Sequence, residues 1–147
     1  MANSIKRPSD GLAYQITRPA REAGLVEENE EGDASYLATV RVHAVDGLLL
    51  IVDVDDLTNE EEADLHATAI QDTDSTYTSI EGSVTPSGNG YQVQVSNAPD
   101  ANLMEGDTPS ETTAPGVVIL AGKSRNGGSI DRLASDLATI RNDQIRR

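Results

Sequence analysis

The sequence predicts an all-β domain followed by a single C-terminal amphipathic helix, and three observations predict it. Apolar and polar residues alternate with a period of two from Tyr36 to Ala44 and again from Tyr91 to Val95, as they do in half-buried strands. Turn signals separate about eight such segments at intervals of roughly 8 to 12 residues, which is typical of an antiparallel sandwich or barrel. Only near Ser129 does the period become helical.

The composition predicts one soluble domain with an aliphatic core. The chain has 147 residues, with no Phe, Trp or Cys and only four Tyr, so Val, Ile, Leu and Ala must fill the interior. Without Cys there is no disulfide, no thiol nucleophile and no zinc site of the Cys type. The longest apolar run, Leu48 to Val52, is far shorter than the roughly 20 residues of a membrane span. The N-terminus lacks the apolar stretch of a signal peptide.

The charges are sorted along the chain. From Val42 to Gly122 there are fifteen Asp and Glu but no Lys or Arg, and the net charge of the chain is −14. Such a surface repels itself in dilute buffer, whereas in molar salt the Debye length shrinks to ~3 Å and the repulsion is screened. With nine Arg against two Lys, the composition resembles that of haloarchaeal proteins. This resemblance concerns habitat, not activity.

The first third of the chain contains short elements. Residues 1–13 are expected to form a polar arm that becomes ordered only against another surface. Residues 14–17 are predicted to form a strand, and Pro19 to Ala23 a helical turn that ends at Gly24. The acidic residues 27–33 are predicted to form a loop.

The clearest element is a hairpin. The strand from Tyr36 to Ala44 places Val42 on one face and both Arg41 and His43 on the other. Asp46-Gly47 favours a two-residue turn, and residues 48–54 return as a more apolar strand.

Residues 57–71 are ambiguous. Thr58 and Glu61 form the capping box of a helix, while Leu65, Ala67 and Ala69 alternate as a strand would. We predict an acidic loop followed by a strand.

A second hairpin is predicted further along. Residues 76–85 form a strand rich in Thr, Tyr, Ile and Val, residues 86–90 turn the chain, and residues 91–95 return. Residues 97–115, with three prolines, are expected to be a long loop, and residues 116–121 a buried strand.

The chain therefore divides into an arm (1–13), a β domain (14–122), and a linker with a basic C-terminal helix (123–147). The last segment holds six basic and three acidic residues. Such a tail packs on its own acidic body, on that of a neighbouring subunit, or on nucleic acid, and the sequence leaves these three options open. One stripe of the helix is apolar and contains Ile130, Leu133, Leu137 and Ile140.

No motif indicates catalysis. The two histidines, His43 and His66, are in no motif, and we expect both to be solvent-facing strand residues. The acidic run from Asp53 to Asp64 lacks the spacing of an EF-hand and is expected to be a solvated face. Gly-x-Ser-x-Gly, His-Glu-x-x-His and a framework for a Ser/His/Asp triad are absent. We predict no catalytic residue, metal, cofactor or small-molecule substrate, and hence no enzyme.

One local pattern resembles a known family. Three segments are similar to the swapped-hairpin AbrB-type DNA-binding module: Tyr14-Gln-Ile-Thr-Arg-Pro-Ala-Arg-Glu-Ala-Gly-Leu25, Glu31-Gly-Asp33 and Asp46-Gly-Leu-Leu-Leu50. A fainter second copy comprises Tyr91-Gln-Val, Leu103-Met-Glu-Gly-Asp107 and Gly116-Val-Val-Ile-Leu120. The resemblance implies an obligate dimer that contacts phosphates through Arg18, Arg21 and Arg41. Directly ahead of Ile16-Thr17, where the module usually has a basic residue, this chain has Tyr14-Gln15. The second copy contains no basic residue.

In outline, the chain also resembles small capsid proteins of haloarchaeal viruses, of the single jelly-roll or decoration type. On this interpretation it is a non-enzymatic, self-assembling minor capsid subunit (penton or decoration) of the virion, whose partners are its own copies and other capsid proteins. The alternative is an AbrB-like transcriptional regulator in the haloarchaeal cytoplasm. The capsid interpretation predicts that side chains of both chain ends contact adjacent subunits: Lys6, Arg7, Ile130, Arg132, Leu133, Leu137, Ile140, Arg141, Arg146 and Arg147.

Overall fold

The computed structural model describes residues 5–6, 11–45, 47–71, 78–87, 90–122 and 128–146, and its strands form three antiparallel sheets. The five-stranded sheet has the order β10 (Ser110–Ala114), β11 (Val117–Ala121), β6 (Leu48–Asp53), β5 (Thr39–Val45), β7 (Thr78–Ser83). The four-stranded sheet has the order β1 (Ile5–Lys6), β2 (Ala13–Gln15), β9 (Gly90–Gln94), β8 (Thr85–Ser87). A ribbon pairs β3 (Val26–Glu28) with β4 (Ala34–Leu37).

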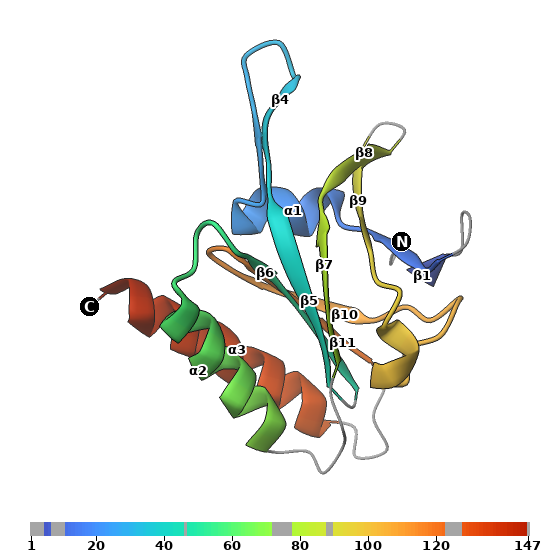
Figure 1. Cartoon of the computed structure of the whole chain (residues 1–147), viewed down its shortest axis with the longest axis vertical. Helices are drawn as coiled ribbons and strands as arrows, with labels where there is room; N and C mark the ends of the chain where they lie inside the picture. The colour runs from blue at the N-terminus through green and yellow to red at the C-terminus, as the bar shows by residue number, and fades with distance from the viewer. Residues whose placement is uncertain are drawn as a thin grey trace.

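The predicted β-rich chain with a C-terminal helix is confirmed, but a closed barrel is wrong. Each sheet has an open strand order and ends in edge strands, and the chain passes from the five-stranded to the four-stranded sheet between β7 and β8. The helices are α1 (Thr17–Ala23), α2 (Asn59–Gln71), the short 3-10 helix η1 (Ala98–Ala101) and α3 (Gly128–Arg146). Figure 1 shows α2 and α3 side by side over the five-stranded sheet, with α1 near the base of the projecting ribbon.

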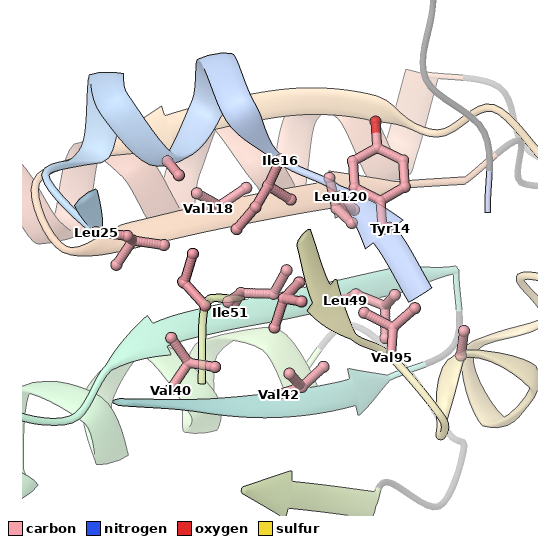
Figure 2. Packing of buried hydrophobic residues seen from close by; sticks show 14 of the residues in the cluster. Tyr14, Ile16, Leu25, Val40, Val42, Leu49, Ile51, Val95, Val118 and Leu120 are labelled. Carbon is pink, nitrogen blue, oxygen red and sulfur yellow. The ribbon is translucent and has the colours of Figure 1, made fainter. Parts of the chain in front are cut away.

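Apolar side chains fill both faces of the five-stranded sheet. Along β6, Leu48, Leu50 and Val52 join the cluster beneath α2 and α3, whereas Leu49 and Ile51 point into a second cluster. This alternation explains why every residue of β6 is buried. Figure 2 shows the second cluster, in which side chains of β5 and β6 face those of β11 and those of Ile16 and Leu25, which flank α1.

The acidic loop and strand predicted for residues 57–71 are wrong, because a helix forms there. Thr58 N–H donates to Glu61 Oε1 at 2.8 Å, and Glu61 N–H donates to Thr58 Oγ1 at 3.1 Å. This reciprocal capping box satisfies two backbone donors at the start of α2. The apparent alternation was misleading, since Leu65 and Ala69 lie one helical turn apart and are buried, while Ala67 is exposed.

The hairpin of β5 and β6 is confirmed, with Val45 opposite Leu48. The helical turn that ends at Gly24 is also confirmed. The second hairpin is shorter than predicted: β8, which overlaps the predicted turn at residues 86–90, pairs with β9. Strand β7, which lies in the predicted partner strand, pairs with β5 instead. No short turn joins β5 to β7, so the sequence pattern did not indicate that these two strands pair.

Three predicted irregular segments contain strands. Ile5 of the predicted arm is buried opposite Tyr14, where β1 pairs with β2. The acidic residues 27–33 overlap β3 and the turn of the ribbon. Residues 97–115 contain η1 and β10, an edge strand of the five-stranded sheet whose polar sequence resembles that of a loop.

Two parts of the chain repeat one order of elements. The N-terminal unit has the order β2, α1, β5 and β6, with the ribbon of β3 and β4 inserted after α1, and the C-terminal unit has the order β9, η1, β10 and β11. In each unit the helical turn ends at a left-handed residue, Gly24 (φ 79°) or Asn102 (φ 60°), which is followed by a leucine. Each closing hairpin turns at a left-handed glycine, Gly47 (φ 81°) or Gly116 (φ 78°). Both turns need backbone that glycine adopts without strain.

The two units are locked together reciprocally. Gly47 N–H of the N-terminal unit donates to Ala101 O at 2.9 Å, and Gly116 N–H of the C-terminal unit donates to Ala23 O at 2.6 Å. Each hairpin tip is thereby fastened to the end of the other unit's helical turn. The strands are shared in the same way, since β2 pairs with β9 and β6 pairs with β11. The repeat is therefore an intertwined pair within one chain.

Candidate functional site

The most distinctive group of polar side chains lies between α2, β5 and β7, and we call it the polar cluster. Alternation along β5 directs Val42 into the core and His43 to the opposite face. The antiparallel register then sets Ser79 opposite His43 and Glu81 opposite Arg41. Helix α2 covers this face with Glu62 and His66, which are one turn apart. The cluster consists of Arg41, His43, Glu62, His66, Ser79 and Glu81.

A chain of short hydrogen bonds runs through the cluster. The distance from Ser79 Oγ to His43 Nδ1 is 2.6 Å, and that from His43 Nε2 to Glu62 Oε2 is 2.7 Å. Arg41 donates from one guanidinium nitrogen to Glu62 Oε1 at 2.6 Å, and from the other to Glu81 Oε1 at 3.3 Å. Because Glu62 accepts from Arg41 through one oxygen, its other oxygen is assigned as the acceptor for His43, and the imidazole proton belongs on Nε2. His43 Nδ1 then accepts the hydrogen bond from the Ser79 hydroxyl.

Burial favours the neutral form of both imidazoles of the cluster. Burial is the main cause that lowers the pKa of His43, and the hydrogen bond to Glu62 opposes it. Burial also lowers the pKa of His66, with a further contribution from His43. The two rings stack with their centroids 4.8 Å apart, so a charge on one disfavours a charge on the other.

The expectation that both histidines are solvent-facing strand residues is wrong. His43 is on a strand but only 5% exposed, because α2 covers the face on which it lies. His66 is on that helix and half-buried. The acidic run is also less solvated than expected, since Asp53 is buried and accepts from the Tyr36 hydroxyl at 2.7 Å. Among the described residues, no group of three or more potential ligands is arranged to hold a metal ion.

A second buried ion pair involves a predicted subunit contact. Arg141 of α3 is 3% exposed and donates from Nε to Pro115 O at 2.7 Å. Its other nitrogens reach Glu61 Oε2 at 2.7 Å and Asp56 Oδ2 at 3.2 Å. Arg141 therefore binds groups of its own chain.

The other predicted subunit contacts are dispersed. Lys6 and Arg132 are exposed, Ile140 is half-buried, and Leu137 of α3 is fully buried. The remaining candidates lie outside the described residues, either entirely or in their side chains: Arg7, Ile130, Leu133, Arg146 and Arg147.

The predicted DNA contacts all have acidic partners. Arg18, whose side chain is 86% exposed, pairs with Glu22 at 3.0 Å. Arg21 binds Glu28 through two nitrogens, at 2.7 and 3.1 Å. Arg18 and Arg21 lie together on α1, whereas Arg41 belongs to the polar cluster.

A separate cavity of about 280 Å³ lies beside η1 and β10, away from the polar cluster. No helix of the described chain is both long enough and apolar enough to cross a membrane. Neither a protein-family model nor a curated protein nor a solved structure matches the chain.

Proposed function

We propose that this protein is a non-enzymatic, AbrB-like DNA-binding regulator of a halophile, with two swapped-hairpin units joined in one chain. The observation that carries the proposal is the reciprocal pair of hydrogen bonds from Gly47 to Ala101 and from Gly116 to Ala23. The two units coincide with the two stretches of sequence that resemble the AbrB-type module. An intertwined pair in one chain replaces the obligate dimer that the resemblance implies.

The DNA-binding face of this proposal is α1. Arg18 and Arg21 are three residues apart and therefore on neighbouring positions of the helix surface, and both are accessible. The corresponding turn of the C-terminal unit, η1, contains Asp100 and no basic residue. Two phosphate contacts predict a shallow salt dependence, with a slope of log K against log salt of about −2. Such weak dependence suits binding in concentrated salt.

The test is fluorescence anisotropy with a labelled duplex over a series of potassium chloride concentrations. The wild-type chain is expected to bind with the shallow slope, and the double change Arg18→Gln and Arg21→Gln to abolish binding. Arg132→Gln is the matched control, because Arg132 is an exposed arginine on α3. Equal affinity of the double variant and the wild type would contradict the proposed face, and no binding at any salt concentration would contradict the function.

A second candidate is the self-assembling capsid subunit, which the pairing of Arg18 and Arg21 with carboxylates favours. Paired arginines on a chain of net charge −14 offer DNA little positive surface. Lys6 and Arg132 are the exposed basic contacts in this proposal. Light scattering near saturating sodium chloride is expected to detect assembly that Lys6→Glu with Arg132→Glu prevents. Single molecules at every protein concentration would contradict it.

A further inference from the structure

We propose that Ser79 is an activated hydroxyl that takes an acyl group from an activated ester, with His43 as its general base. The inference goes beyond the proposed functions and depends on neither of them. It concerns one stoichiometric modification of the chain, not turnover. Three linked side chains of the polar cluster carry it: Ser79, His43 and Glu62.

The geometry meets the requirements of nucleophile activation. An activated serine needs a base within about 2.6 to 3.2 Å and a third group that orients the base. The Ser79 Oγ to His43 Nδ1 distance of 2.6 Å and the His43 Nε2 to Glu62 Oε2 distance of 2.7 Å satisfy both. Arg41 holds the other oxygen of Glu62, so the carboxylate that orients the base is itself fixed.

The exposures of the three residues suit their roles. Ser79 is exposed on β7, whereas the His43 and Glu62 side chains are 7% and 8% exposed. A reagent therefore reaches the hydroxyl, while the base and the orienting carboxylate are shielded from water. The lowered pKa of His43 keeps Nδ1 unprotonated and able to accept a proton at neutral pH.

The edge position of β7 supplies a backbone donor. Just after β7, Val84 N–H donates to Ala38 O. In an antiparallel ladder, hydrogen-bonded pairs alternate with non-hydrogen-bonded pairs, so every second residue directs its N–H and C=O toward the partner strand. Thr78, Ile80 and Gly82 therefore direct their backbone groups toward β5. The N–H of Ser79 points to the outer side of the edge strand, next to its own hydroxyl. A donor in this position stabilises the oxyanion that forms on an attacked carbonyl.

The reaction transfers one acyl group. Ser79 Oγ attacks the carbonyl carbon of the ester while its proton moves to His43 Nδ1. The bond from that carbon to the leaving oxygen then breaks, and the leaving group takes the proton from Nδ1. Ser79 becomes an ester, the alcohol or phenol is released, and His43 returns to its neutral form.

The test is acetylation of the full chain by p-nitrophenyl acetate in molar potassium chloride, with the modified residues mapped by peptide mass spectrometry. Ser83 is an internal control, because it lies on the same face of β7 and is exposed, but opposite Thr39 instead of a histidine. General base catalysis predicts that Ser79 reacts about 10² times faster than Ser83. Equal rates at the two serines would overturn the proposal.

Two variants test the role of each partner. His43→Gln is expected to reduce the Ser79 rate to that of Ser83. Glu62→Gln, a change at the positioning residue, is expected to lower the rate and to alter its pH profile. Because burial lowers the pKa of His43 from its ordinary 6.5, the Ser79 rate of the wild type should hold down to pH 6.5 and fall only at lower pH, and the Ser83 rate should not fall with it. A Ser79 rate with no such pH dependence would overturn the proposal even if a variant failed to fold.

Discussion

At the residue scale, His43 shows how covering one strand face changes the chemistry of a side chain. The alternation along β5 correctly directs the His43 and Val42 side chains to opposite faces of the sheet, with Val42 in the larger apolar cluster. Helix α2 then covers that face and supplies Glu62, which binds the imidazole. A residue expected to face solvent is therefore buried in a network whose exposed members are Ser79 and Glu81.

The buried imidazole predicts that the protein loses stability in mild acid. In the unfolded chain His43 takes a proton as the pH falls through about 6.5, whereas the folded chain, with its lowered pKa, takes it only at lower pH. The free energy of unfolding should therefore decrease from pH 6.5 down to the folded pKa. The pKa of His66 is also lowered, so this residue contributes to the same loss of stability. At His43, the contact with Glu62 raises the pKa and the charge of Arg41 lowers it.

Urea unfolding at pH 7.5 and pH 5.5 measures this effect, with the salt concentration held constant. The double variant His43→Gln and His66→Gln should lose less stability between the two pH values than the wild type. The same loss in both proteins would show that other groups cause it.

Arg141 predicts a second effect at this scale. Arg141→Gln leaves Glu61 and the Pro115 carbonyl without their partner beneath α3, and removing one member of a buried charge pair is costly. We expect the free energy of unfolding to fall by about 2 kcal/mol. This loss is smaller than that for a fully buried ion pair, because the Asp56 side chain is half exposed and water screens its charge. Arg132→Gln, at an exposed site on the same helix, should change it by less than about 0.5 kcal/mol.

At the element scale, the turn glycines differ in what surrounds them. Gly116 and Gly32 both have positive φ, 78° and 85°. A Cβ on Gly116 would lie 2.5 Å from Asp56 Oδ2 and 2.8 Å from Leu57 Cδ1, whereas a Cβ on Gly32 would meet nothing within 4 Å. The hairpin tip that locks the two units is therefore packed tightly, and the tip of the ribbon is open.

This contrast predicts different costs for the same change. Gly32→Ala should lower the free energy of unfolding by about 1 kcal/mol, the cost of a left-handed alanine. Gly116→Ala has the same backbone cost and in addition displaces Asp56 and Leu57, so we expect a loss of at least about 2 kcal/mol. Thermal unfolding of both variants measures the difference. Equal losses would mean that the side chains around Gly116 move aside freely.

At the scale of the whole molecule, charge and packing act in opposite directions. The net charge of −14 destabilises the compact state through repulsion, while two apolar clusters on opposite faces of one sheet stabilise it. The C-terminal helix belongs to this packing, since Leu137 and Arg141 are both buried. Its basic charge is thus partly satisfied within its own chain.

The repulsion predicts that salt stabilises the protein. Raising potassium chloride from 0.1 M to 2 M shortens the Debye length from about 10 Å to under about 3 Å, which screens the acidic surface. The melting temperature should rise steadily over this range, as differential scanning calorimetry can measure. Glucose at matched osmolarity is the control, because it adds no ions, and an equal rise in glucose would exclude charge screening as the cause.

The sequence by itself determined the local features: the β5 and β6 hairpin, the turn that ends at Gly24, the strand β11 and the acidic net charge. Each depends on residues close together in the chain, such as Asp46 and Gly47. It also contained the capping box of Thr58 and Glu61, which was outweighed by a chance alternation of apolar residues.

Only the tertiary structure decided the polar cluster and the intertwining of the two units. The cluster needs β7 to pair with β5, although β6 and α2 separate these two strands in the sequence. It also needs α2 to cover the face of the sheet that carries His43. Sequence periodicity specifies which side chains share a face, but not what covers that face. Contacts such as Gly116 to Ala23 join residues far apart in the chain, so only the folded packing brings them together.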